Sequence, residues 1–258
     1  MTVTVLLENT THRADLQAEH GLSLYVEACG RRMLFDMGQT DAFARNAEVL
    51  GVDLSRVDTA VLSHGHYDHG GGLPTFLALN DTSPVYLSRH AFGEHYNGSN
   101  KYVGLDPALM GHPRLRYTAG KTHVADGLTL FAEASLPSLW EPGTFGLTVR
   151  QGNRTVPDPF CHEQYLLMEE KGLRVLISGC SHRGILNIVD QFRPHILIGG
   201  FHVSKMPLDG ELTALAQRLS EYGTDFYTGH CTGLPQAAFM ARHIARLHTL
   251  SCGNRILL

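Results

Sequence analysis

Short apolar segments rich in β-branched residues alternate with Gly, Asn and Asp along the first two thirds of the chain. This pattern is typical of strands bounded by turns. Two of the segments, joined by Cys29-Gly30-Arg31, indicate a hairpin. The expected strands are residues 2–7, 22–27, 32–35, 57–62, 85–87, 128–132, 146–150, 164–169 and 173–177.

The spacing of apolar positions becomes helical in the last third. Apolar residues at i, i+3, i+4 and i+7 predict an amphipathic helix over residues 210–222, namely Leu212, Leu215, Ala216 and Leu219. An earlier helix over residues 41–50 is expected to be capped by Thr40 and stopped by Gly51. Other helices are expected at 72–79, at 185–192 and through Met240, Ile244 and Leu247, alternating with strands at 195–198, 225–227 and 255–258.

Residues 91–121 show neither pattern and are rich in Gly, Asn, Tyr and Pro, so we expect loops that wall a pocket. Strands interleaved with helices after an early β-rich stretch predict an α/β fold of layered sheets covered by helices. No shift in composition marks a boundary, and we therefore expect one domain over residues 1–258.

Composition and charge exclude some classes of partner. The chain is 43% hydrophobic and 18% charged, which is ordinary for a globular protein. Its net charge of -4 argues against bulk attraction to nucleic acid or to an anionic membrane, and no apolar run is long enough to span a bilayer. We expect a small-molecule substrate and neither nucleic acid nor a membrane as partner, and we leave oligomerisation open.

The cysteines are odd in number and widely spread: Cys29, Cys161, Cys180, Cys231 and Cys252. This argues against a disulfide framework and for a reducing compartment. The short apolar N-terminus lacks a basic region and a cleavage motif. We therefore expect no signal peptide and a cytoplasmic location.

Histidine is unusually frequent, with 16 residues beside 21 Lys plus Arg, and several histidines gather after the strand expected at 57–62. His64 and His66 are two apart, so in extended chain they point to the same side and can chelate one ion. Asp68 and His69 follow at once and suit a second ion. Glycines around them, Gly65 among these, give the backbone room to wrap such a cluster.

The run from His64 to His69 resembles the metal-binding motif of the metallo-β-lactamase superfamily. Other segments of the sequence also match motifs of this family, and together they extend over almost the whole chain. Asp36-Met37-Gly38 is similar to the family's early Asp-x-Gly, whose Asp supports the metal ligands, and Thr228-Gly229-His230 resembles the late strand that ends in a ligand. The resemblance implies a four-layer αββα sandwich, with two mixed β-sheets flanked by helices and a dinuclear site at one edge.

Two departures from the family pattern narrow the resemblance. Cys180 replaces the usual bridging Asp, and residues 134–137 lack the histidine expected near them. His182 can supply the missing donor, and Cys180 can supply a thiolate. Together with Gly199-Gly200-Phe201-His202, these features resemble the branch of 7,8-dihydropterin-6-methyl-4-(β-D-ribofuranosyl)aminobenzene-5'-phosphate synthase, which does not fix a substrate.

The resemblance implies a dinuclear metallohydrolase. Its expected nucleophile is a hydroxide shared by two ions, oriented by Asp68, with His202 as proton donor to the leaving group. Zinc suits the His/Asp/Cys mixture best, and iron or manganese are alternatives. The expected ligands are His64, His66 and His182 for one ion and Asp68, His69 and His230 for the other. Cys180 is expected at or near the position that bridges the two ions. Asp36 is expected to support the ligands by a hydrogen bond to a ligand histidine.

The substrate is less constrained than the metal site. Ser181, Arg183 and Gly184 open a helix, where free N–H groups and a cation can hold a phosphate. With the branch resemblance, this favours a phosphate ester or cyclic phosphodiester of a small, for instance pterin-like, molecule. A lactone or thioester is the alternative on the same site. A diiron redox protein and a non-catalytic, metal-stabilised binding or sensor protein also stay open.

The remaining histidines stand in no motif. Nine of them are interpreted as ordinary surface or core residues, among them His20, His95 and His162. Of the nine, His95 and His162 are among those nearest in sequence to the loops expected to wall the pocket.

Overall fold

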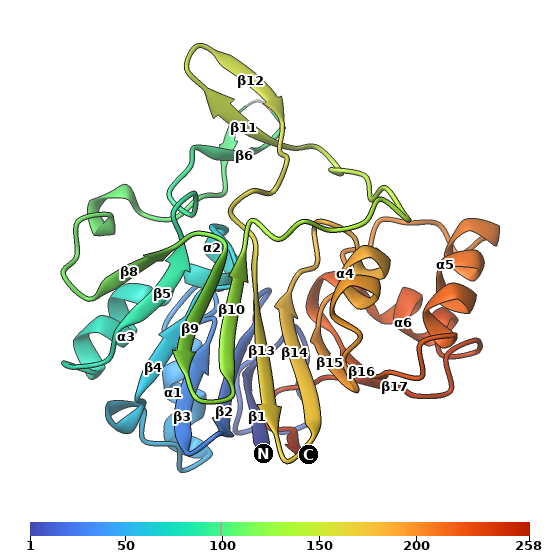
Figure 1. Cartoon of the computed structure of the whole chain (residues 1–258). Helices are drawn as coiled ribbons and strands as arrows, with labels where there is room; N and C mark the ends of the chain where they lie inside the picture. The colour runs from blue at the N-terminus through green and yellow to red at the C-terminus, as the bar shows by residue number, and fades with distance from the viewer. Residues whose placement is uncertain (99) are drawn as a thin grey trace.

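The computed structural model describes residues 1–98 and 100–258. Two seven-stranded sheets dominate it (Figure 1). In the first sheet an antiparallel half is continued by a parallel half. Its strands in spatial order are β18 (Arg255–Leu257), β1 (Thr2–Leu7), β2 (Ser23–Ala28), β3 (Arg31–Phe35), β4 (Thr59–Val61), β5 (Val85–Ser88) and β8 (Leu115–Thr118).

The second sheet has the same mixed character, with an antiparallel half followed by a parallel half. Its strands in spatial order are β9 (Lys121–Ala125), β10 (Leu128–Ala132), β13 (Gln164–Glu170), β14 (Leu173–Gly179), β15 (Ile196–Gly199), β16 (Asp225–Thr228) and β17 (Leu247–Thr249).

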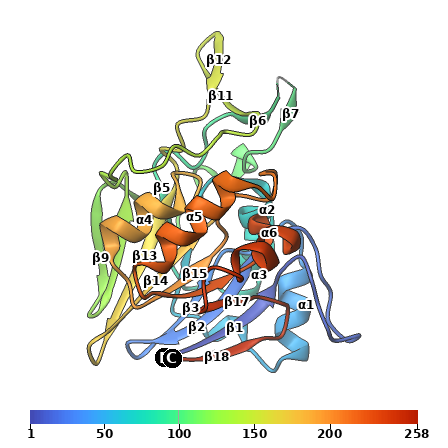
Figure 2. The ribbon, with the colours of Figure 1, turned by 90° about the vertical axis from the view of Figure 1, so that its right-hand side faces the viewer.

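Helices cover the outer face of each sheet, which confirms the expected αββα sandwich (Figures 1 and 2). The first sheet carries α1 (Ala42–Val49) and α3 (Leu73–Leu79), and the second carries α4 (Ile185–Phe192), α5 (Gly210–Ser220) and α6 (Leu234–Met240). Between the first sheet and the small third sheet lies the four-residue helix α2 (Tyr67–Gly70). Short 3-10 helices occur at Leu54–Arg56, Pro107–Leu109 and His230–Thr232.

Alternation along the strands divides the interior into three cores. On β3, Met33 and Phe35 face the second sheet, whereas Leu34 between them faces α1 and α3. Successive side chains of a strand point to opposite faces, so a strand covered on both sides is apolar at every position. The third core lies between the second sheet and helices α4 to α6.

A small third sheet stands at one edge of the sandwich, above α2 in Figure 1. Its order is β12 (Arg154–Pro157), β11 (Leu147–Gln151), β6 (His95–Asn97) and β7 (Lys101–Tyr102). The expectation that residues 91–121 form only loops was therefore wrong. The sequences of β6, β7 and β8 do not alternate between apolar and polar residues. These segments are strands because their backbones pair with neighbouring strands.

Most other elements fall within two residues of their expected bounds. β1 and α4 match them fully. The helix expected through Met240, Ile244 and Leu247 was wrong. The helix α6 ends at Met240, and Leu247 is the first residue of β17. The apolar spacing there arises because a turn and a strand bury residues against the same core. Strands β9, β12 and β17 were not expected. Among the described residues, no helix is long and apolar enough to cross a membrane.

Candidate metal centre

The candidate ligands follow the ends of strands in both sheets and meet at the edge below the third sheet. The carboxyl ends of parallel strands are where α/β proteins place their sites. The loop after β4 and the helix α2 carry His64 to His69, and the turns after β14, β15 and β16 carry the other candidates, namely Cys180, His182, His202 and His230.

One cluster contains His64, His66 and His182, all buried. The Nε2 atoms of His64 and His182 face each other at 3.2 Å. Burial, followed by the neighbouring histidines, lowers the pKa of both rings well below the usual value. Both rings are therefore neutral and offer lone pairs to a ligand between them. The structure thus brings together the three residues that the sequence assigned to one ion.

The second cluster contains His69, His230 and Asp68. The Nε2 atoms of the two histidines lie 3.1 Å apart, and an Asp68 oxygen lies 3.3 Å from His230 Nε2 and 4.0 Å from His69 Nε2. Although burial works against ionisation, the neighbouring His69 and a hydrogen bond from His20 lower the pKa of Asp68 well below its ordinary value. Asp68 is thus a carboxylate with both oxygens available as acceptors.

These separations fit a bound transition metal. In a tetrahedral site with metal–nitrogen bonds of roughly 2.0–2.1 Å, neighbouring ligand atoms stand roughly 3.3 Å apart. Two buried lone pairs at that spacing repel each other unless a proton or a cation lies between them. The residues present therefore fit the divalent ions that the sequence implied.

The rings of three candidate ligands are held through their second nitrogen. His64 Nδ1 donates to Ser63 Oγ at 2.8 Å, His69 Nδ1 to Asp36 Oδ2 at 2.7 Å, and His230 Nδ1 to Asn9 Oδ1 at 2.9 Å. A proton fixed on Nδ1 leaves Nε2 free to bind a metal, and such partners are typical of metal histidines. Asp36 occupies the place expected for it.

Cys180 lies beside the second cluster, with Sγ 3.1 Å from His69 Nε2. Burial raises the pKa of its thiol well above the ordinary value. Cys231 donates to the Cys180 carbonyl at 3.5 Å, and His202 completes a group of three potential donors with these cysteines. His202 also lies against His182, with ring centroids 4.1 Å apart. Both residues therefore sit at the centre, as the sequence predicted.

Four residues in or next to the candidate centre have a strained backbone conformation. Asp36, Ser181, His202 and His230 have φ values of 58°, 57°, 53° and 48°. Non-glycine residues adopt this left-handed region at a cost of order 1 kcal/mol or more, which the surrounding structure must offset. Each of the four follows the end of a strand in the candidate centre.

A pocket of about 320 Å³ opens onto both clusters. Its lining includes residues that the sequence did not assign to the centre: His20, Lys101 and Lys205. His20 Nε2 lies 3.2 Å from an Asp68 oxygen, so its interpretation as an ordinary residue was incomplete. No motif surrounds these residues, and only their position in space relates them to the centre.

The predicted phosphate site at Ser181, Arg183 and Gly184 is not supported by their contacts. Glu163 occupies the turn that leads into the helix, because its carboxylate accepts from His182 N at 2.7 Å and from Arg183 N at 3.1 Å, both ahead of the N-cap Gly184. Ser181 is fully buried and pairs with a neighbouring serine, and the Arg183 guanidinium donates to a backbone carbonyl. None of the three predicted residues belongs to the lining of the 320 Å³ pocket among the described residues.

Glu163 therefore positions the turn that carries His182. Tyr165 donates to the same carboxylate at 2.7 Å. We expect Glu163→Gln to lower the free energy of unfolding by about 1–3 kcal/mol, because the new amide leaves a buried N–H without an acceptor. Tyr165→Phe, which removes one of the three hydrogen bonds, is expected to cost about 1 kcal/mol. Denaturant unfolding of both variants measures this, and equal stability of Glu163→Gln and wild type would contradict the role.

Comparisons with known proteins agree with this geometry. Residues 17–230 match the sequence model of the metallo-beta-lactamase superfamily. An uncharacterized protein of Methanocaldococcus jannaschii is 29% identical over 250 residues, which span 90% of either chain. The 7,8-dihydropterin-6-methyl-4-(beta-D-ribofuranosyl)-aminobenzene-5'-phosphate synthase of that organism is 27% identical over 250 residues, spanning 86% of this chain and 84% of the synthase. A solved structure described as a metal-dependent hydrolase of the beta-lactamase superfamily has a TM-score of 0.86 and 29% identity, covering 100% of this chain and 99% of the other.

Proposed function

Because the chain belongs to the metallo-beta-lactamase superfamily, we propose that it is a metal-dependent hydrolase that cleaves a phosphate ester or cyclic phosphodiester of a small molecule. One observation carries the proposal: there are two sets of potential metal ligands with three residues in each, and two residues of each set line the same pocket. The solved relative described as a metal-dependent hydrolase supports the reaction class.

The ligand residues of this chain would hold two divalent ions, zinc by preference for the mixed nitrogen, oxygen and sulfur donors, with iron or manganese as alternatives. Such ions supply Lewis acidity and lower the pKa of water toward roughly 7. Asp68, accepting a hydrogen bond from His20, orients the attacking water. His202 stands at the pocket wall with both ring nitrogens free of partners among the described residues, and it donates a proton to the leaving group.

Two lysines of the pocket support a phosphate-bearing substrate. Lys101 and Lys205 are exposed at its rim, and Lys205 is fixed by donating to the Phe145 carbonyl at 3.0 Å. Cations at the mouth of a pocket favour an anionic ligand. The pocket volume of about 320 Å³ lies at the small end of the range for small-molecule sites.

A second candidate is group transfer, because one relative is named as a synthase of a ribosyl-linked aromatic phosphate. Its acceptor would replace water in the same pocket. A lactone or thioester substrate, a diiron redox activity and metal-stabilised binding without catalysis are the outcomes that would displace phosphate hydrolysis.

Metal content per chain, measured by elemental analysis, tests the centre. Wild type is expected to hold about two ions per chain, and His64→Ala and His182→Ala are each expected to lose the ion of the first cluster. Cys180→Ala is expected to retain at least that ion. If wild type holds no transition metal, or if His64→Ala retains all of it, the proposed centre is wrong.

A substrate panel tests the reaction. Metal-loaded protein is assayed on a phosphomonoester, a phosphodiester, a cyclic nucleotide, a lactone and a thioester. We expect turnover of a phosphate substrate, and Lys205→Gln is expected to raise its KM by up to about fivefold, since one exposed ion pair contributes up to about 1 kcal/mol. An unchanged KM with Lys205→Gln, or turnover of the lactone or thioester alone, would contradict phosphate recognition.

A further inference from the structure

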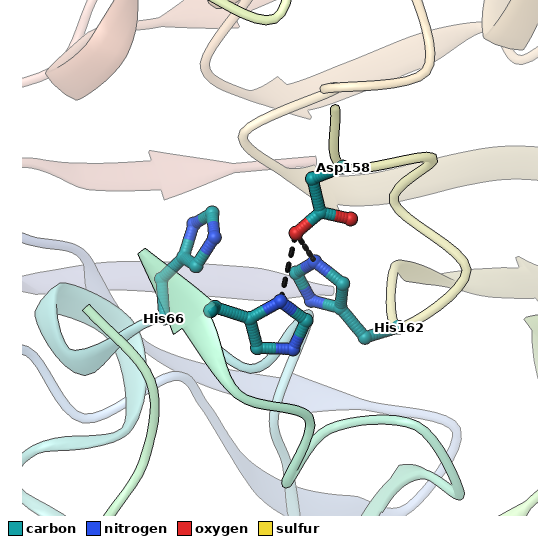
Figure 3. A group of neighbouring side chains, drawn as sticks. His66, Asp158 and His162 are labelled. Atoms are coloured by element: carbon teal, nitrogen blue, oxygen red, sulfur yellow. Dashed lines mark hydrogen bonds and ion pairs between the residues drawn. The ribbon is translucent and has the colours of Figure 1, made fainter. Parts of the chain in front are cut away.

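A second group of buried polar side chains lies beside the metal centre but outside both ligand clusters. His95 is on β6, and Asp158 and His162 are on the connection from β12 to β13. Their exposed fractions are 2%, 3% and 1%. They adjoin His66, and Figure 3 shows Asp158 and His162 directed toward each other beside that ring. Because burying a carboxylate is costly, this arrangement requires an explanation.

The hydrogen bonds fix the protons of the group. Asp158 Oδ2 lies 2.7 Å from His95 Nδ1 and 3.3 Å from His162 Nε2, and its other oxygen accepts from the Phe160 N–H at 2.7 Å. The Gly65 N–H donates to His162 Nδ1 at 2.9 Å. A backbone amide can only donate, so Nδ1 of His162 carries no proton. The proton of this neutral ring is therefore on Nε2, facing Asp158.

These protons argue against a further metal ion in the group, even though four residues of metal-ligand type meet there. A metal on His162 Nε2 would displace the proton to Nδ1, where it would face the Gly65 N–H. The pKa of His162, lowered to about 4 by burial despite its bond to Asp158, agrees with a neutral ring. The group is better explained as a support for the chain at Gly65.

Gly65 is the residue between the two ligand histidines of the first cluster. Its backbone is confined on the opposite side, because a Cβ at Gly65 would lie 2.1 Å from the Ala91 carbonyl oxygen. The His162 ring thus holds the peptide that sets the directions of His64 and His66. The proton on His162 Nε2 faces the Asp158 carboxylate, and His95 holds that carboxylate with a hydrogen bond of 2.7 Å.

We propose that Asp158 and His162 are positioning residues of the metal centre, which act through the Gly65 N–H to orient His64 and His66. The inference rests on the metal centre of the proposed function but not on its substrate or reaction. Failure to hydrolyse any substrate would therefore leave it standing, because its test measures metal affinity.

The test compares two substitutions of similar shape. His162→Asn keeps an acceptor where Nδ1 stands, whereas His162→Leu removes it. Zinc affinity is measured by competition with a chelator, and the stability of each metal-free variant is measured alongside. We expect His162→Leu to lower zinc affinity by about 10–100-fold, as substitutions of residues that support metal ligands do. His162→Asn is expected to retain most of the wild-type affinity at a stability comparable to that of His162→Leu.

Wild type provides an independent measurement that does not depend on the folding of a variant. Nitrogen-15 NMR of the histidine rings is expected to show His162 with its proton on Nε2, in the metal-free and the zinc-loaded protein. A proton on Nδ1, equal zinc affinity of His162→Leu and wild type, or no difference between the Leu and Asn variants would overturn the inference. So would a further zinc ion per chain that His95→Gln alone removes.

Discussion

Replacing His69 with alanine is expected to reduce zinc affinity at the second cluster by more than about 100-fold. His69 Nε2 lies 3.1 Å from both His230 Nε2 and Cys180 Sγ, so the ring faces two other potential donors at once. Substitutions that only touch the partners of metal ligands already cost about 10–100-fold in affinity. Loss of a ligand atom itself is expected to exceed that range.

Metal per chain and chelator competition measure the effect of His69→Ala. Hydrolysis of the best substrate is expected to fall in parallel, because the pocket would lose the ion that faces Asp68. His123→Ala is the matched control, since His123 is an exposed histidine on β9, the edge strand of the second sheet. A His69→Ala protein that keeps the full metal content of wild type would refute the second cluster.

Asp36→Asn is expected to have the second large effect, on stability and on metal binding together. The Asp36 carboxylate is fully buried and accepts three hydrogen bonds of 2.7 Å, from Ser63 N, Ser63 Oγ and His69 Nδ1. Asparagine keeps one acceptor, and its NH₂ group faces donors that then lack a partner. The expected loss in free energy of unfolding is about 3–5 kcal/mol, as for a buried charged partner removed from its pair.

The same substitution is expected to weaken zinc binding by about 10–100-fold. Without the carboxylate, the His69 proton can move from Nδ1 to Nε2, where it occupies the lone pair needed for the metal. Denaturant unfolding and chelator competition measure the two effects. Asp41→Asn is the control, because the Asp41–Arg45 ion pair is on the surface and such pairs contribute at most about 1 kcal/mol. Unchanged stability and affinity in Asp36→Asn would contradict the support attributed to this carboxylate.

Local sequence patterns predicted those parts of the fold that depend on neighbours in the chain. β1 and α4 matched because every apolar position of each packs against a core, so the period is visible without knowledge of the partner. β6 and β7 were missed because their strand character comes from pairing with each other and with β11. The segment after Met240 was misassigned because a turn and a strand imitate a helical spacing.

The residues of the candidate centre also fall into those that the sequence indicated and those that it did not. Chain geometry alone predicted His64 and His66 on one side of an extended loop, and the resemblance to the metallo-β-lactamase superfamily indicated His230 and Asp36. The sequence also indicated a phosphate site at the start of α4. The contacts give that prediction no support, because Glu163, which precedes β13 and lies 20 residues before Arg183, accepts from the turn that leads into the helix.

By itself, then, the sequence predicted a metal-binding cluster and the candidate ligands that lie within one short run, because spacing along an extended chain fixes which side chains point together. The tertiary structure decided which distant groups complete and support that run. His20 on Asp68, Asn9 on His230 and His162 on Gly65 are contacts between segments brought together by sheet pairing and packing, and the run from His64 to His69 contains no information about them.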